Sequence, residues 1–186
     1  MHMNKFVKYL SVIVFTLFTL PAFALDDAVS TGIFNDTAID GYDTVAYFTQ
    51  GKPVEGNKKF AFLWRDANWR FSSQENLDLF KQNPEMYAAQ YGGYCAWAMA
   101  DGKTAGIDPD AWHIEDGKLY LNYNKSVQQD WLSTMQADIV SADKNYPEIT
   151  DVKKYLNNWF YNLKLVARKF GLFLFKKKCK VNILNI

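Results

Sequence analysis

Three residues in the middle of the chain carry side chains that bind soft metal ions. Cys95 and Met99 are four residues apart, and His113 is one of two histidines among the 186 residues. Residues four apart share one face of a helix, so the thiolate and the thioether would point the same way. Thiolate, thioether and imidazole ligands together suit Cu(I). The sequence therefore offers a copper or other transition-metal site made of Cys95, Met99 and His113.

Each of these residues also has a structural interpretation, which we favour. Free cysteine is among the most buried residue types, and methionine fills gaps between aromatic rings. A single histidine on a strand, such as His113, is more often a packed or surface residue than a ligand. Thiol redox chemistry at Cys95 would lack a Cys-x-x-Cys partner, because Cys179 is the only other cysteine. Packing is the first interpretation, and metal binding and thiol redox chemistry stay open as alternatives.

Nucleophilic catalysis is not indicated by the serines. The run Ser72-Ser73-Gln74-Glu75 fits a capping box, which predicts Ser72 as the N-cap of a helix. A nucleophilic serine needs a general base, and His113 is the only histidine after residue 2. The chain also has no Gly-x-Ser-x-Gly motif. We therefore expect a protein without catalytic activity.

Tryptophans and a cation could instead line a ligand pocket. A concave, ring-lined surface with a few polar groups is typical of small-ligand sites. The candidate pocket residues are Trp64, Trp69, Arg70, Trp97 and Trp112. Lys103 or His113 could orient an anionic ligand in such a pocket. Large rings also supply core area in a small domain, and burial in the core is the interpretation that we favour for the same residues.

Acidic residues cluster in the same region as His113. Asp108, Asp110, Glu115 and Asp116 lie within nine residues, but their spacing is not that of an EF-hand. The dipeptides Asp108-Pro109 and Asp116-Gly117 are explained by turn chemistry alone. We do not expect a calcium site here.

The elements that position these residues begin with two hairpins. Aromatic-rich runs at 59–64 and 68–71 flank three residues and predict a β-hairpin. A second hairpin is predicted over Ala111–Glu115 and Lys118–Asn122, because an Asp-Gly pair between them favours a type I′ turn. The apolar run 45–48, with sequence VAYF, predicts one more short strand.

Helices are predicted between and after the hairpins. Ser72 begins one helix, Asn83-Pro84 ends it, and Pro84 begins another that continues to Gly92-Gly93. The run 94–100 fits a short helix or a buried strand, and its alanines and Gly102 favour the helix. Apolar residues then recur about every four positions over 126–146, which predicts a long final helix. The whole pattern indicates one α+β domain with small antiparallel hairpins and several helices.

Long strings within residues 41–149 resemble a known family. They are GYDTVAYFTQGKPVEG at 41–56, WRFSSQENLDLFKQNPEMYAAQYGGYCAWAM at 69–99 and DPDAWHIEDGKLYLNYNKSVQQDW at 108–131. On these strings the chain is similar to exported YHS domain-containing proteins. The resemblance implies a small α+β core of treble-clef-like type, often linked to metal handling.

The YHS pattern has an aromatic-Cys-Ser-x-x-Cys stretch that opens a helix. The stretch that matches it here is FSSQEN, which puts Ser72 and Asn76 at the two cysteine positions. A further cysteine pair near the domain start is absent around residues 42–45. The resemblance therefore implies the scaffold without its thiolate ligands, and one Cys with one His cannot build a four-ligand zinc site.

Residues 1–24 predict an export signal. Lys5 and Lys8 precede a 12-residue apolar run, which Pro21 ends before the small-x-small motif Ala22-Phe23-Ala24. Cleavage after Ala24 would deliver the chain to the periplasm, and an uncleaved N-terminal anchor is the alternative. The run is shorter than the roughly 20 residues that span a bilayer.

Charge divides the rest of the chain into a body and a tail. Residues 25–150 carry 10 Lys and Arg against 19 Asp and Glu, a net charge of −9, whereas 151–186 carry 9 against 1, or +8. Phosphate contacts need clustered Lys and Arg, so we do not expect the acidic body to bind nucleic acid. Over 152–170 the tail predicts a cationic amphipathic helix that contacts a membrane surface, and docking on the body or disorder is the alternative.

The sequence thus predicts a signal peptide (1–24), a YHS-like domain (25–150) and a cationic C-terminal tail (151–186). The function that we expect is that of a periplasmic binding or accessory module. Its ligand, which is a small molecule or a metal, and its oligomeric state are not identified by the sequence.

Overall fold

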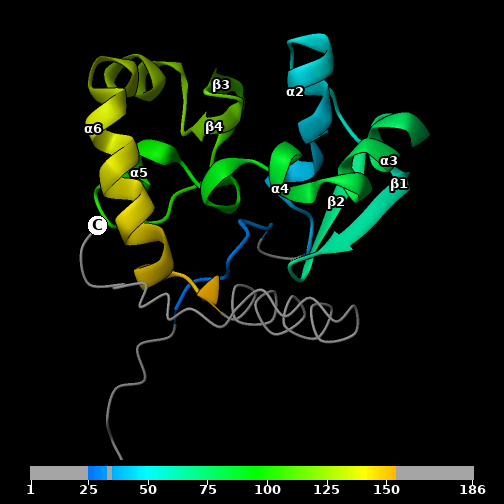
Figure 1. Ribbon diagram of the computed structural model, residues 1–186, viewed down its shortest axis with the longest axis horizontal. Helices are drawn as coiled ribbons and strands as arrows, with labels where there is room; N and C mark the ends of the chain where they lie inside the picture. Colours follow the sequence, from blue (N-terminus) through cyan, green and yellow to red (C-terminus); the bar gives the residue numbers. More distant parts are fainter. Residues whose placement is uncertain (1–24, 33–34, 154–186) are drawn as a thin grey trace, which may run out of the picture.

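The computed structural model of the protein describes residues 25–32 and 35–153. They form a single-domain α+β fold with two antiparallel two-stranded sheets, as predicted (Figure 1). The N-terminal lobe consists of η1 (Ile39–Gly41), α2 (Thr44–Gln50), β1 (Asn57–Trp64), β2 (Ala67–Phe71), α3 (Gln74–Gln82) and α4 (Pro84–Tyr87). After η2 (Gln90–Gly93), the C-terminal lobe consists of α5 (Ala96–Ala100), β3 (Asp108–Glu115), β4 (Lys118–Asn122) and α6 (Lys125–Ile149).

Both predicted hairpins are confirmed. β1 pairs with β2 across the turn Arg65-Asp66, and β3 pairs with β4 across Asp116-Gly117. All four turn residues have positive φ angles, between 50° and 71°. Two consecutive positive φ values match the right-handed twist of the flanking strands, which is why such two-residue turns close hairpins.

The predicted strand at 45–48 is wrong, because this run lies within helix α2. Asp43 is the N-cap, and its Oδ1 accepts hydrogen bonds from the backbone N–H groups of Val45 (2.9 Å) and Ala46 (3.3 Å). Gly51 ends the helix in the left-handed conformation, with φ 66°. A four-residue apolar run has no diagnostic period, so the capping residues outside it decide the structure.

The helix after β2 begins one residue later than predicted, so Ser72 as its N-cap is wrong. Ser73 caps α3 and accepts from the Asn76 backbone N–H (3.1 Å), whereas the Ser72 hydroxyl turns toward Asp43. Either of the two adjacent serines could cap the helix. Because the Ser72 hydroxyl donates to the buried carboxylate of Asp43, Ser73 is the one that caps it.

The helix predicted from Pro84 to Gly92-Gly93 is also wrong in length. Pro84 does begin α4, but this helix ends at Tyr87 because Ala88 is extended. The next turn, η2, holds Tyr91 and Gly92 at φ 55° and 63°. Three consecutive left-handed residues, ending with Gly93 at φ 85°, cannot continue a right-handed helix.

The last two predicted helices are confirmed with small changes at their ends. The short helix α5 lies within the predicted 94–100, and Gly102 follows it at φ 72°. The final helix α6 continues past Tyr146 and includes Pro147 in its last turn. The Thr150 N–H and hydroxyl both donate to the Tyr146 carbonyl, and these bonds close the helix after the proline.

Strand β4 lies between the two halves of the hydrophobic core. Leu119 and Leu121 face the cluster of the N-terminal lobe, in which Trp69, Phe71 and Phe80 are almost fully buried. Tyr120 points the other way and joins the C-terminal cluster. The members of that cluster that are buried are Tyr91, Ala96, Met99, Tyr120, Trp131 and Ala142. The alternation along one strand therefore connects the two lobes.

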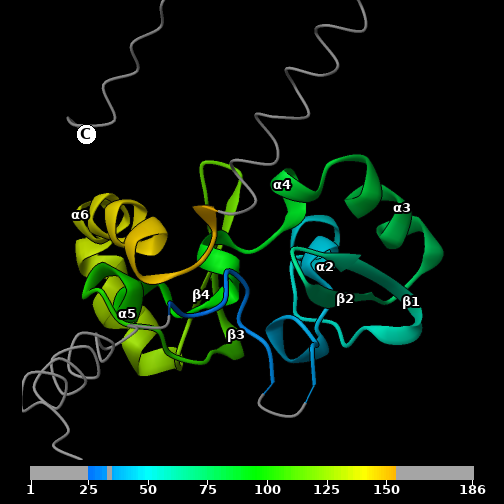
Figure 2. The same ribbon diagram turned by 90° about the horizontal axis from the view of Figure 1, so that it is seen from below.

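The first described residues run beside the end of α6 (Figure 2). The Asp26 N–H donates to the Ile149 carbonyl, and the Asp151 side chain accepts from the Ala28 N–H at 2.8 Å. Val152 is buried, so ordered contacts continue just past residue 150. The predicted signal segment and nearly all of the predicted amphipathic helix, with Cys179, lie outside the described residues. Among the helices that the structure does describe, none has the length and apolar character to cross a membrane.

Candidate functional site

The three residues of the predicted soft-metal site have separate neighbours. Cys95 is a buried free thiol just before α5, and its Sγ lies 3.8 Å from the Asn122 Oδ1. Met99 packs in the C-terminal cluster. The His113 ring lies edge-on to Trp131, and its Nε2 is 3.4 Å from the Glu115 carboxylate. The Met99 N–H donates to the Cys95 carbonyl at 3.0 Å, but no described contact joins the three side chains. Metal or redox chemistry at Cys95 stays a prediction.

Acidic side chains around His113 do not gather into a metal site either. Within residues 25–32 and 35–153, no group of three or more His, Cys, Asp and Glu side chains is placed to hold an ion. Asp108 instead accepts from the Asp110 N–H at 2.9 Å, and Glu115 accepts from Gln136. These carboxylates are used in turns and strand contacts.

Of the predicted pocket residues, Trp64 alone lines the cavity described below. Trp69 is buried in the core, with its Nε1 donating to the Trp64 carbonyl. Trp112 packs edge-on against Tyr47, and Trp97 is 42% exposed. Arg70 lies near the backbone of Gly41 and Gly56 in the N-terminal lobe. The structure thus spreads these five residues over both lobes.

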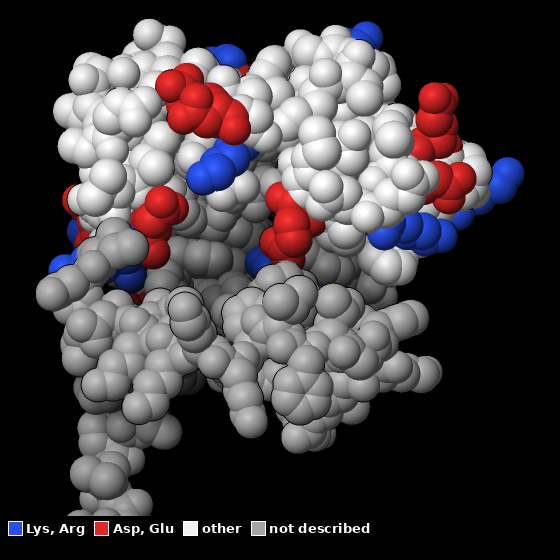
Figure 3. Space-filling model, viewed as in Figure 1, with Lys and Arg blue, Asp and Glu red and all other residues white. Residues whose placement is uncertain are grey.

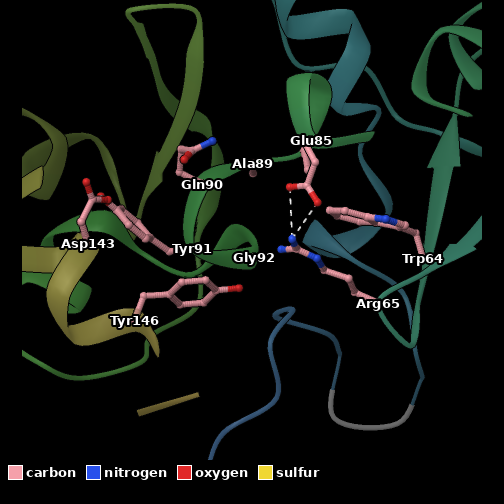
Figure 4. A pocket seen from close by; sticks show the side chains of 10 residues that line it. Trp64, Arg65, Glu85, Ala89, Gln90, Tyr91, Gly92, Asp143 and Tyr146 are labelled. Carbon is pink, nitrogen blue, oxygen red and sulfur yellow. Dashed lines mark hydrogen bonds and ion pairs between the residues drawn. The ribbon is translucent and has the colours of Figure 1, made fainter. Parts of the chain in front are cut away.

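A cavity lies where the two lobes meet (Figure 4). Its volume is about 180 Å³, and four parts of the chain line it. The first hairpin turn contributes Trp64 and Arg65, and α4 contributes Glu85. The turn η2 contributes Gln90, Tyr91 and Gly92, and helix α6 contributes Asp143 and Tyr146.

Arg65 is held on three sides within this cavity. Its guanidinium lies over the Trp64 ring, 4.4 Å from the ring centroid, and one nitrogen donates to both oxygens of Glu85 at 2.8 and 3.1 Å. Arg65 also hydrogen-bonds to the Tyr146 side chain, whose hydroxyl points toward it in Figure 4. The Arg65 side chain is 14% exposed and that of Glu85 is 67% exposed. A turn residue of one lobe is thereby fixed against a helix of the other.

The opposite wall carries a second carboxylate, that of Asp143. The Tyr91 hydroxyl donates to the Asp143 carboxylate at 3.0 Å. Burial raises the pKa of Tyr91, and the negative charge of Asp143 raises it further. Burial also raises the pKa of Tyr146, although Arg65 acts in the opposite direction. Both hydroxyls therefore stay protonated at neutral pH and act as hydrogen-bond groups, not as bases.

The backbone is strained at the cavity. Tyr91 is a non-glycine residue at φ 55°, in a region that L-residues avoid. The same turn packs tightly against Ala28 and Ile39. A Cβ atom added at Gly92 would collide with the Ala28 carbonyl oxygen, and one added at Gly93 would collide with the Ile39 side chain. Ile39 is itself a β-branched residue at φ 42°. Strain of this kind persists where the surrounding structure fixes it and is common at functional sites.

A different polar cluster is closed inside the N-terminal lobe. Asp43 is fully buried, and its Oδ2 accepts from the Ser72 N–H (2.8 Å), the Ser72 hydroxyl (2.6 Å) and the Asn76 amide (2.7 Å). With the two cap bonds to α2, every lone-pair direction of this carboxylate is used. Ser72 and Asn76 are the positions that the YHS resemblance assigns to cysteines, and here they hold a carboxylate.

Most of the cavity residues were not singled out by the sequence. Arg65 and Glu85 are ordinary charged residues of a turn and a short helix, and nothing local distinguishes them. Asp143 and Tyr146 are three apart and share a face of α6, which was the one available signal on that helix. The pair Gly92-Gly93 indicated a turn in the backbone, but the sequence did not indicate which residues pack against this turn.

Comparisons with protein-family models, with curated proteins and with solved structures found no match to this chain. The geometry described above is therefore the basis for the functional interpretation, and the YHS resemblance stays a prediction.

Proposed function

We propose that this chain is an exported, non-catalytic binding module of the YHS type that takes up a small ligand in the cavity between its lobes. The observation that carries the proposal is the convergence of Arg65, Glu85, Tyr91 and Asp143 on one cavity from four parts of the chain. Small-ligand sites are commonly concave, ring-lined and equipped with a few fixed polar groups. The strained turn at Tyr91 supports the same location.

Binding fits this cavity better than catalysis does. Its guanidinium is paired with Glu85, and its buried tyrosine hydroxyls stay protonated at neutral pH. Groups in these states orient and recognise a ligand, whereas a general base needs a pKa near the working pH. The volume of about 180 Å³ lies below the 300–1,000 Å³ of sites for drug-sized molecules, so the ligand is smaller than those.

The test is a fragment screen by NMR on ¹⁵N-labelled residues 25–186. The library should contain cationic, anionic and neutral fragments, so that the result does not depend on ligand charge. We expect hits to shift the backbone amides of the cavity residues, which are Arg65, Glu85, Gln90, Tyr91 and Gly92. Hits that map only to other surfaces, or no hits of any charge, would show that this cavity is not the binding site.

A blocking variant makes the screen specific. Gln90 is half-buried and lines the cavity, so Gln90→Trp should fill it and abolish the shifts. The matched control is Gln136→Trp, at an exposed position on α6 outside the cavity, which should leave the hits unchanged.

A further inference from the structure

The charge of the cavity walls indicates which ligands they attract. The lining contains one cationic side chain, Arg65, and two carboxylates, Glu85 and Asp143. Because Glu85 binds the guanidinium through both oxygens, the positive charge is neutralised within the wall itself. The Asp143 carboxylate receives only the neutral hydroxyl of Tyr91 among its described hydrogen bonds, so its charge is not cancelled there. The cavity as a whole is negative.

The surroundings strengthen this sign. Residues 25–150 carry a net charge of −9, and acidic side chains lie over both lobes on the face shown in Figure 3. A field of one sign around a cleft raises the local concentration of oppositely charged ligands. An anionic ligand would have to displace Glu85 from Arg65 and approach the Asp143 carboxylate as well.

The remaining lining suits the apolar part of a cation. The rings of Tyr91 and Tyr146 border the space between Asp143 on one side and the Arg65–Glu85 pair on the other (Figure 4). Aromatic rings attract ammonium groups through their negative faces and also pack against methylene groups. The Gln90 side chain, above these rings in Figure 4, offers a carbonyl oxygen as a further acceptor.

We infer that the ligand of this cavity is a small organic cation, with an ammonium or similar head group and a short apolar chain. The Asp143 carboxylate attracts the head group, Glu85 offsets the positive charge of Arg65, and the tyrosine rings hold the chain. This inference rests on the proposed function, since it specifies the ligand class of the same cavity.

The test uses three probes of equal chain length on residues 25–186. They are n-butylammonium, n-butanol and butyrate, which differ only in the charge of the head group. We expect n-butylammonium to bind at the cavity amides at least about five-fold more tightly than n-butanol, with butyrate weakest. Raising the salt from about 10 mM to about 200 mM should weaken n-butylammonium binding and leave n-butanol binding unchanged.

Isosteric variants assign the effect to the two carboxylates. Asp143→Asn keeps an acceptor for Tyr91, and Glu85→Gln keeps one for Arg65, so neither change should disturb the fold. Each should weaken n-butylammonium binding about three- to ten-fold, whereas the control Glu75→Gln, at an exposed position of α3, should not.

The outcomes separate the two proposals. If library fragments shift the cavity amides but n-butylammonium binds no better than butyrate or n-butanol, the cation inference is wrong and the binding site stands. The same holds if Asp143→Asn and Glu85→Gln both bind n-butylammonium as tightly as the unsubstituted protein does. If the cavity amides respond to no fragment at all, the proposed function itself fails.

Discussion

Two polar clusters of this protein have similar side chains and opposite settings. Around Asp43 the carboxylate is fully buried, and neighbouring side chains and backbone supply all of its hydrogen bonds. Around Arg65 and Asp143 the groups border a cavity, and Glu85 is 67% exposed. A cluster satisfied from within has nothing to offer a ligand. The open cluster keeps charged groups at a surface that a ligand can reach, so we assign stability to the first and binding to the second.

The largest expected effect comes from breaking the closed cluster. Asp43→Ala removes the cap of α2 and leaves the Ser72 and Asn76 donors buried without their acceptor. A lost cap costs about 0.5–2 kcal/mol, and hydrogen bonds to a charged group contribute about 1.5–3 kcal/mol each, so we expect a loss of at least about 3 kcal/mol. Urea denaturation followed by circular dichroism measures it.

The control for this variant is Asp78→Ala. Asp78 is an exposed carboxylate on α3 that accepts one bond from Gln74, and its loss should change the free energy of unfolding by no more than about 0.5 kcal/mol. Equal effects of the two substitutions would mean that the Asp43 cluster is not the structural element described here.

The next effect tests the turn that forms the cavity floor. Gly92 and Gly117 both have positive φ, but an added Cβ would meet the Ala28 backbone at Gly92 and nothing within 4 Å at Gly117. Gly117→Ala should cost about 1–2 kcal/mol from the left-handed backbone alone. Gly92→Ala should cost about 1–3 kcal/mol more, because overpacking is added. Thermal or urea unfolding of both variants measures the difference in the free energy of unfolding. Equal losses in Gly92→Ala and Gly117→Ala would show that the close packing at Gly92 does not contribute to stability.

These glycines also show what the sequence could and could not predict. The Asp116-Gly117 turn was predicted because its type depends on two adjacent residues, and the hairpins and long helix α6 followed from local patterns. The turn at Tyr91 depends on Ala28 and Ile39, which are more than fifty residues away in the chain. Likewise, VAYF became a helix because Asp43 is held in place by Ser72 and Asn76.

The candidate site was missed for the same reason. Cys95, Met99 and His113 attracted attention because their side chains carry distinctive chemistry. The cavity is instead made of common residues whose importance arises from position, since Arg65 meets Tyr146 only when the lobes pack together. No local pattern in a single sequence predicts this contact between Arg65 and Tyr146.

A smaller effect on stability is expected at high pH. Burial raises the pKa of Tyr120 to about 12, with the charge of Asp143 adding to the effect. A raised pKa favours the neutral phenol in the folded state, so its stabilisation is complete below pH 10 and is lost as the pH rises through 12. The free energy of unfolding should therefore fall between these values.

Substitution assigns part of this loss to Tyr120. In Tyr120→Phe the fall with pH should be shallower than in the wild type, whereas Tyr123→Phe, at a residue 58% exposed, should leave the slope unchanged. Urea titrations at a series of pH values measure the slope. The same slope in all three proteins would show that burial of Tyr120 does not contribute to the alkaline transition.

The smallest effect on stability is expected from the open cluster, at Glu85→Gln. The ion pair with Arg65 has one partner that is largely in solvent, and exposed pairs contribute about 0–1 kcal/mol. Glutamine keeps an oxygen for the guanidinium, so the free energy of unfolding should change by less than about 0.5 kcal/mol. Binding of n-butylammonium should nevertheless weaken, since the cavity wall then holds one cation and one anion.

Calorimetric titration of n-butylammonium and urea denaturation of the same preparation compare the affinity with the free energy of unfolding. A variant that loses stability as Asp43→Ala does, while keeping its affinity, would reverse the assignment of the two clusters.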